Sequence, residues 1–325
     1  MNMLRVDKKT KIELLRLMAQ SRLFEEKIVS VYGRQDMKTP VHLYIGQEAV
    51  AAGVCAQLRR EDYIFSTHRN HGHYLSKGAD MPGLVAELYG RQTGCSKGKG
   101  GSMHFVDVSC GCMGTSSIVG GAIPLAVGAA LAAKVKKEDR ISVAFFGDGA
   151  ADEGVFQESL NFAALHKLPV VFVCENNYYA TNSHQSARHA RETIAKRGQA
   201  FGLPGSRHDG NNVEAVYIAA RKAVNRARRG LGPSLLEFTT YRWKGHVGPD
   251  CDHEKGCRPK PELESWQRHC PIEAYKKILL KEQILDQAGI AALNDKISET
   301  IESAWKKALA APYPGPEELY KDVYR

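Results

Sequence analysis

Two short and strongly apolar runs, separated by about one helix of chain, limit the folds open to this sequence. The first is ISVAFF at residues 141–146, and the second is PVVFVC at residues 169–174. The residues between them, from about 155 to 166, have the spacing of a helix. A strand, a helix and a second strand of this kind form a right-handed unit whose strands lie parallel. The chain is therefore expected to fold as an α/β protein.

The rest of the chain continues this alternation, which predicts a doubly wound, mostly parallel sheet with helices on both faces. A helix is expected at residues 213–229, and strands are expected near Ala200 and at residues 234–243. No internal repeat or linker-like boundary appears. We expect residues 1–325 to form one domain, with a helix at 10–33 and a helix and tail at 286–325 as extensions. The prolines of the tail predict an extended or turn-like end.

Composition excludes several other classes of protein. The apolar runs are shorter than the roughly 20 residues that a membrane span needs, and the start of the chain is too polar for a secretory signal, so a cytoplasmic location is expected. The formal charge is +9, but basic and acidic residues are interleaved and no nucleic-acid-binding motif accompanies them. We therefore expect neither nucleic acid nor a membrane as a partner. The 8 cysteines lack the spacing of a disulfide framework and are expected to be mostly reduced.

Polar residues close both apolar runs. Asp148, in a GDG motif, follows the first run, and Asn177, in an NN pair, follows the second. Because both strand ends open on one edge of the sheet, where ligands bind, these residues are expected to meet. Carboxylate, amide and main-chain oxygens suit Mg²⁺ or Ca²⁺ rather than zinc. Gly147 and Gly149 allow close approach of the main chain, and the amides of Gly149 and Ala150 face an anion. The motifs therefore predict a metal that holds a diphosphate.

Two other phosphate or metal motifs are excluded by single positions. An EF-hand loop fails because Ala150 stands where a ligand is required. A P-loop fails because the spacing from Gly94 to Lys99 is one residue short and Gly100 replaces Ser or Thr. Another Mg²⁺-dependent enzyme, such as a phosphotransferase, stays open at this point, and nucleotide binding would distinguish it.

The GDG motif, followed after about thirty residues by NN, resembles the thiamine diphosphate motif. The whole chain is similar to the alpha subunit of the first component of the thiamine diphosphate-dependent 2-oxo acid dehydrogenases, in the pyruvate and acetoin dehydrogenase group. The similarity extends over LFEEKIVSVYGR, HLYIGQEAV, STHRNHG, GKGGSMH, IVGGAIPLAVGAALA, YRWKGH and EELYKDVY. It implies an enzyme that uses thiamine diphosphate and Mg²⁺ to decarboxylate a 2-oxo acid or to cleave acetoin, and that passes an acyl or hydroxyalkyl group to an acceptor such as lipoamide.

The resemblance assigns ligands for the metal and the diphosphate. The metal ligands are Asp148, Asn177 and the main-chain carbonyl of Tyr179. Two arginines of the family hold the diphosphate, and they match Arg69 in STHRNHG and Arg242 in YRWKGH. Guanidinium groups suit this role because they stay charged and match phosphate geometry.

The resemblance also assigns residues to the rest of the cofactor and to proton transfer. Ser117 and Val119 occupy the positions that contact the aminopyrimidine ring and bend the cofactor. His42 and His246 match two histidines of the family, and histidine can give and take protons near neutral pH. His246 is also expected to contact the cofactor, and His68 stands where the mammalian pyruvate enzyme has a tyrosine beside the diphosphate.

Thiamine enzymes need a glutamate against the aminopyrimidine, and in this family a separate beta subunit supplies it. An alpha₂beta₂ assembly is therefore expected, with an inactive isolated chain and a lipoyl-bearing acyltransferase as a further partner. Two alternatives stay open: an acyl-transferring thiamine enzyme of a biosynthetic pathway, and a noncatalytic assembly subunit with the same fold.

Overall fold

The computed structural model of the chain describes residues 6–191 and 193–322. Its centre is a parallel sheet of 6 strands within these ranges, in the order β2-β1-β3-β4-β8-β7. A separate antiparallel pair, β5 and β6, follows β4. The strands are β1 Tyr63–Thr67, β2 Cys112–Ser116, β3 Ser142–Gly147, β4 Val170–Asn176, β5 Tyr179–Ala180, β6 Ser183–His184, β7 Gly205–Asp209 and β8 Ser234–Thr239. The expected mostly parallel α/β sheet is confirmed.

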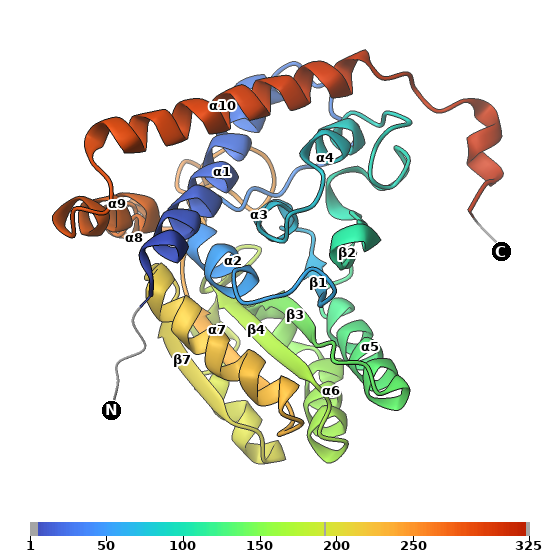
Figure 1. The fold of residues 1–325 in the computed structure, drawn as a ribbon, viewed down its shortest axis with the longest axis vertical. Coiled ribbons are helices and arrows are strands. Elements are labelled where there is room, and N and C mark those ends of the chain that lie inside the picture. Colours follow the sequence, from blue (N-terminus) through green and yellow to red (C-terminus); the bar gives the residue numbers. More distant parts are fainter. Residues whose placement is uncertain (1–5, 192, 323–325) are drawn as a thin grey trace.

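Helices cover both faces of this sheet (Figure 1). They are α1 Lys8–Tyr32, α2 Glu48–Cys55, α3 His71–Ser76, α4 Met81–Leu88, α5 Ala122–Lys136, α6 Gly154–Leu165, α7 Val213–Arg228, α8 Lys260–Arg268, α9 Pro271–Lys281 and α10 Gln287–Ala310. Short 3₁₀ helices are η1 Gly101–Met103, η2 Val108–Cys110, η3 Asp148–Asp152, η4 Gln185–Ala187, η5 Ala195–Phe201 and η6 Pro316–Tyr320.

The central strand β4 shows why both faces need a cover. Val171 and Val173 pack into a core cluster with residues of α1, α2, α4, α7 and α10. Phe172 and Cys174 point to the opposite face, where α5 and α6 supply the neighbouring apolar residues. Because successive strand residues face opposite sides, a run such as VVFVC is apolar throughout only when both sides are buried. The doubly wound arrangement is therefore confirmed.

The long helices begin at polar caps. The Asp7 carboxylate accepts a 2.9 Å hydrogen bond from the Thr10 amide at the start of α1, which begins two residues before the expected boundary. Asp286 accepts a 2.7 Å bond from the Gly289 amide at the start of α10. Such caps satisfy amides that the first turn of a helix leaves unpaired. The helices expected at 10–33 and 213–229, and the helix expected to begin at residue 286, are confirmed within a few residues.

One expectation about local structure was wrong, and one strand was not expected. Ala200 lies in η5 rather than in a strand, and the strand β7 begins at Gly205. The edge strand β2 was not expected from the sequence. The tail has no regular structure over residues 312–315, in agreement with the expectation from its prolines, and then forms the short 3₁₀ helix η6; residues 323–325 of the expected tail lie outside the described residues. Both missed strands are short and largely polar edge strands, which carry no apolar alternation.

Within the described part of the chain, no helix has the length and apolar character needed to cross a membrane.

Candidate active site

The carboxyl ends of β3 and β4 bring the two polar motifs to one edge of the sheet. The strands are parallel neighbours, and Gly147 at the end of β3 lies opposite Glu175 in β4. Asp148 directly follows β3, and Asn177 directly follows β4. Both residues line the same cavity. The two strand ends therefore meet, as the parallel arrangement requires.

Most of the expected site residues line this cavity, which has a volume of about 110 Å³. Ser117 is not on its wall: the Ser117 hydroxyl lies 3.3 Å from Nε2 of His104, while Ser116 and Ile118 line the cavity. His42 lies behind the wall. The expected residues on the wall are His68, Arg69, Val119, Gly147, Asp148, Gly149, Ala150, Asn177, Tyr179, Arg242 and His246.

The side chain of Asn177, which lines the cavity, is held by two hydrogen bonds. Its Nδ2 donates a 3.0 Å hydrogen bond to Oε1 of Gln47, and its Oδ1 accepts a 3.3 Å bond from the amide of Tyr179. Gln47 is 1% exposed and lines the cavity, and its Nε2 has no hydrogen-bond partner among residues 6–191 and 193–322. A buried donor without a partner is costly, so Gln47 is poised to donate to a ligand.

Asp148 already has a cationic partner. Nη2 of Arg188 donates to Asp148, and Nη1 of the same side chain donates to Asp152. Asp148 is 1% exposed; burial raises the pKa of its carboxyl, and the charge of Arg188 opposes that rise. The Arg188 guanidinium therefore stands beside Asp148 where a metal ion would supply the positive charge.

Two buried arginines give the cavity a positive wall. Arg69 donates to the carbonyl of Leu43 and, over 3.1 Å, to the carbonyl of His246. Nη1 of Arg242 donates to the Asp252 carboxylate over 3.0 Å. Burial and the charge of Arg242 lower the pKa of Arg69 to about 9, and burial and the charge of Arg258 lower the pKa of Arg242 to about 10, so both stay charged at neutral pH. Their combined charge favours an anionic ligand.

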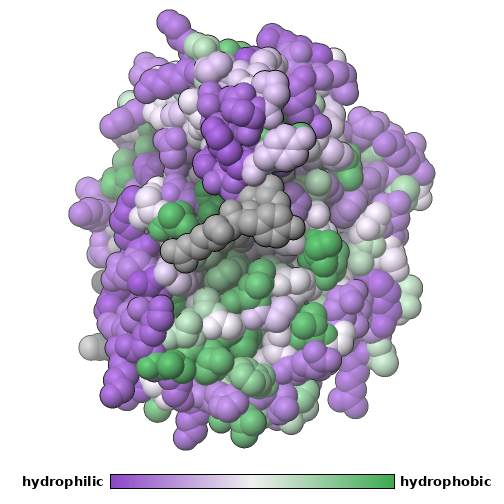
Figure 2. All heavy atoms as spheres, turned by 90° about the vertical axis from the view of Figure 1, so that its right-hand side faces the viewer, coloured by the Kyte–Doolittle hydropathy of each residue, from purple (hydrophilic) through white to green (hydrophobic). Residues whose placement is uncertain are grey.

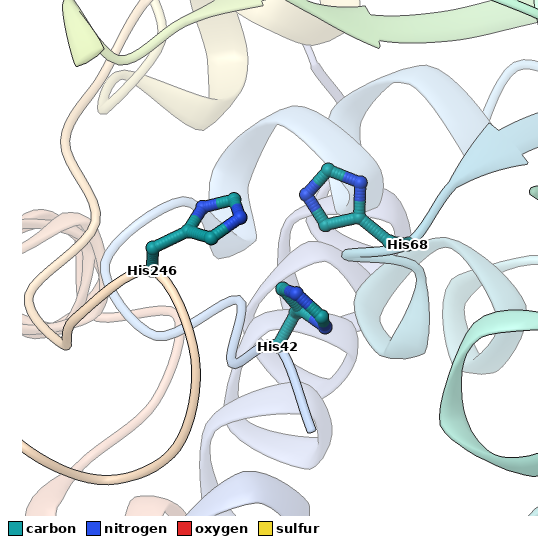
Figure 3. A group of neighbouring side chains, drawn as sticks. All are labelled: His42, His68 and His246. Atoms are coloured by element: carbon teal, nitrogen blue, oxygen red, sulfur yellow. The ribbon is translucent and has the colours of Figure 1, made fainter. Parts of the chain in front are cut away.

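Three histidines face one another beside these arginines, and we call them the histidine cluster (Figure 3). The ring centroid of His42 lies 4.6 Å from that of His68 and 5.1 Å from that of His246. Burial, reinforced by Arg69, lowers the pKa of His42 to about 3, of His68 to about 2 and of His246 to about 4. All three imidazoles are therefore neutral at pH 7.

The cluster has ring nitrogens within 4.8 Å of one another. Nδ1 of His42 is buried and has no hydrogen-bond partner in the part of the chain that the structure describes. Nitrogen ligands of this kind suit zinc, but the neighbouring charge of Arg69 disfavours a cation there. The cluster is thus better suited to exchange protons with an uncharged or anionic ligand.

The sequence model of the dehydrogenase E1 component matches residues 16–317. The chain belongs to this family. The match begins within α1, extends past the end of α10, and includes all the residues that line the cavity.

Relatives of this dehydrogenase E1 component chain include two acetoin:2,6-dichlorophenolindophenol oxidoreductase alpha subunits. The one from Bacillus subtilis is 45% identical over 94% of this chain and 91% of its own length. The one from Cupriavidus necator is 39% identical over 98% of this chain and 95% of its own length. The chloroplastic pyruvate dehydrogenase E1 component subunit alpha-3 of Arabidopsis thaliana is 40% identical over 98% of this chain and 75% of its own length. The resemblance to alpha subunits of the pyruvate and acetoin group is confirmed.

Two residues that bind the polar side chains of the cavity, Arg188 and Gln47, were not identified from the sequence of this E1 chain. Arg188 lies 40 residues after Asp148, in a loop whose several basic residues give no sign of which one reaches the carboxylate. Gln47 lies 130 residues before Asn177, and its place in the GQEA segment marks only a helix start. Long-range pairs of this kind have no local pattern, so only the folded structure identifies them.

Proposed function

We propose that this chain is the alpha subunit of a thiamine diphosphate- and Mg²⁺-dependent enzyme that decarboxylates a 2-oxo acid or cleaves acetoin. The observation that carries the proposal is a single cavity wall with hard oxygen donors on two strand ends and two buried arginines opposite them. The oxygen donors suit a magnesium ion, and the arginines suit a diphosphate. Family membership and the named relatives support the same function.

Asp148, Asn177 and the carbonyl of Tyr179 would hold the magnesium ion, once Arg188 has left Asp148. The glycines fit the diphosphate. A Cβ atom added to Gly147 would have its nearest neighbour, the carbonyl oxygen of Glu175, at 4.0 Å, so the space on the wall beside this glycine is open. A side chain there would occupy room that a phosphate needs.

Arg69 and Arg242 would bind the phosphate oxygens, and the free Nε2 of Gln47 would donate to the same anion. Val119, which is 49% exposed at the mouth of the cavity, would support the part of the cofactor that projects outward. Ser117 would contact it only through its main chain, since its hydroxyl faces His104.

When bound, thiamine diphosphate supplies an electron sink for the carbon–carbon bond cleavage. The chain's own contribution is position and proton transfer. His246 lines the cavity, and its neutral ring can accept a proton from a substrate hydroxyl or return one to a product carbon. His42 lies behind it and would orient the ring or pass protons through His68.

The site also calls for a second chain. A cavity of about 110 Å³ is smaller than the roughly 300–1,000 Å³ typical of small-molecule sites. The helix α5 begins on the cavity wall at Ala122 and Ile123. Figure 2 shows apolar side chains gathered on this side of the molecule. The exposed large apolar residues of α5 and α6 are Leu125, Val135, Phe162 and Leu165. Exposed apolar patches of this kind mark interfaces. We propose that a beta subunit covers this face and supplies the activating glutamate.

The acceptor and the location follow from the same proposal. A lipoyl-bearing acyltransferase would take the acyl group, and the cytoplasmic location expected from the sequence stays a prediction. Arg69 argues against a noncatalytic assembly subunit, because this buried cation donates only to main-chain carbonyls and is costly in a chain that binds no anion.

The test is co-expression with a beta-like chain, followed by an activity screen of 2-oxo acids and acetoin with 2,6-dichlorophenolindophenol as electron acceptor. We expect turnover of at least one of these substrates that depends on added thiamine diphosphate. His246→Ala is expected to keep cofactor binding and to lose turnover. An assembled enzyme that ignores thiamine diphosphate would overturn the proposal, and unchanged turnover in His246→Ala would remove His246 from its role.

A further inference from the structure

Two cysteines at the start of β2 lie outside the residues used by the proposed mechanism. Cys110 ends η2 and Cys112 begins β2, with Gly111 between them in a left-handed conformation at φ 81°. Their sulfur atoms are 3.6 Å apart and share a hydrogen bond. Residues two apart have Cα atoms within about 7 Å of each other, and the bend at Gly111 shortens that separation. The sulfur separation and the short stretch of chain between the residues therefore place the two thiols within reach of an intrachain disulfide.

The backbone holds the two sulfurs together. The amide of Asp107 donates to the carbonyl of Cys112 over 2.8 Å, and the amide of Cys112 donates back to the carbonyl of Asp107 over 3.0 Å. An added Cβ at Gly111 would approach the carbonyl oxygen of Asp62 to 2.1 Å, so the turn is fitted closely against the chain before β1. The main chain of the turn therefore holds the two cysteines close together.

The surroundings favour a reactive thiolate at one of the two positions. The hydrogen bond with Cys112 lowers the pKa of Cys110 to about 7, and the nearby ammonium of Lys77 acts in the same direction. That ammonium is itself fixed by the carbonyls of Arg59, at 2.9 Å, and Arg60, at 3.0 Å. Cys110 and Cys112 are 0% and 2% exposed, but the neighbouring Val108 is 67% exposed, so local opening of this short turn admits a small oxidant.

We propose that Cys110 and Cys112 form a redox-active dithiol, a modification site at which hydrogen peroxide converts the two thiols into a disulfide. The Cys110 thiolate attacks one peroxide oxygen, the O–O bond breaks, and the departing hydroxide takes up a proton to give water and a sulfenic acid. The Cys112 sulfur then attacks the Cys110 sulfur, the S–O bond breaks, and the second hydroxide leaves with the Cys112 proton as water. Two thiols lose two electrons, and one peroxide becomes two waters.

The cysteine pair lies at the start of β2, which leads to the cavity wall. β2 pairs with β1, and the register shifts between Ile64 and Phe65, immediately after Cys112. The other end of β2 leads to Ser116 and Gly120 on the cavity wall. Disulfide formation brings the sulfurs from 3.6 Å to about 2.0 Å. The link would therefore tether the first residue of the strand that delivers this part of the wall.

The test uses the full reduced chain, treated with hydrogen peroxide, alkylated after denaturation, digested and analysed by mass spectrometry. We expect a peptide that contains Cys110 and Cys112, is lighter by two hydrogens, carries no alkyl group, and returns to two alkylated thiols after dithiothreitol. Cys174 is an internal control, because burial raises its pKa well above the usual value. Loss of the Cys110 thiol is expected to be at least about tenfold faster than loss of the Cys174 thiol.

A second measurement, on a variant that lacks one of the two thiols, tests the order of the two chemical steps. In Cys112→Ser, Cys110 has no resolving thiol and is expected to stop at a sulfenic acid, which dimedone traps. Two results would overturn the proposal: both thiols fully alkylated after peroxide, or a disulfide from Cys110 to Cys55 or any cysteine other than Cys112. Neither measurement depends on thiamine diphosphate, so the outcome is independent of the proposed function.

Discussion

Replacing Arg188 by glutamine tests whether the Arg188 guanidinium competes with a metal ion for the Asp148 carboxylate. The Arg188 side chain is 16% exposed and the Asp148 side chain 1% exposed, so their ion pair is largely shielded from solvent. A metal ion that binds Asp148 must first displace this guanidinium. Arg188→Gln removes the competitor and leaves the carboxylate, Asn177 and the arginines of the cavity wall in place.

The magnitude follows from the burial of the pair. Breaking a buried ion pair by removing one partner costs about 3 kcal/mol, because the remaining charge is left uncompensated. The metal-free chain with Arg188→Gln should lose about that much stability. In the parent chain the same energy opposes metal binding, and 1.4 kcal/mol corresponds to a factor of ten. We therefore expect Mg²⁺ to bind Arg188→Gln about a hundredfold more tightly.

The assay is calorimetric titration of Mg²⁺ with saturating thiamine diphosphate, in the assembled enzyme. Arg191→Gln is the matched control, because it removes the same charge from an exposed residue of the same loop. Its Mg²⁺ affinity should equal that of the parent. Equal or weaker Mg²⁺ affinity in Arg188→Gln would refute the idea that Arg188 competes with the metal for Asp148.

Three further predictions concern the cavity wall and its histidines. The three pKa values of the histidine cluster lie near 2 to 4, so below about pH 6.5 the unfolded chain binds protons that the folded chain does not. The free energy of unfolding should therefore fall by about 1 kcal/mol per pH unit for each histidine as the pH is lowered from 6.5 to 4. Denaturant titrations should give a shallower dependence of this free energy on pH for His68→Asn, and an unchanged dependence would contradict the assignment. Gly147→Ala should leave the free energy of unfolding nearly unchanged, because the added Cβ atom meets nothing nearer than 4.0 Å. The same substitution should weaken the binding of thiamine diphosphate about tenfold, as measured by calorimetry. An unaltered affinity would place the diphosphate elsewhere. Asp252→Asn removes the carboxylate that lies 3.0 Å from both Arg242 and Arg258, and it should lower the free energy of unfolding by about 3 kcal/mol. Thiamine diphosphate should raise the melting temperature of this variant more than that of the parent. An equal rise would argue against Arg242 as a diphosphate ligand.

The part of the fold that the sequence predicts well is the part with the strongest local signals. β3 and β4 are apolar throughout because they are buried on both faces, and Asp148 and Asn177 close them as polar ends. Right-handed crossover connections then place both ends on one edge without further information. The meeting of Asp148 and Asn177 at one cavity was therefore predictable from two motifs and one rule of chain topology.

The parts that the sequence predicts poorly depend on distant neighbours. β2 and β7 are edge strands whose residues are mostly half-buried, so neither shows the alternation that marks a strand. The direction of the Ser117 side chain depends on where His104 lies. Arg188 reaches Asp148 only because η4 and the residues after it return to the edge of the sheet. Each of these features is fixed by packing between segments far apart in the sequence.

Calorimetry on the assembled enzyme, titrated with thiamine diphosphate in the presence and absence of Mg²⁺, tests the central claim about Asp148. Asp148→Ala is compared with Asp152→Ala, since both carboxylates bind Arg188 but only Asp148 lines the cavity. We predict that Mg²⁺ strengthens cofactor binding in the parent and in Asp152→Ala, and that this strengthening disappears in Asp148→Ala. Mg²⁺-dependent binding that survives in Asp148→Ala would contradict the account.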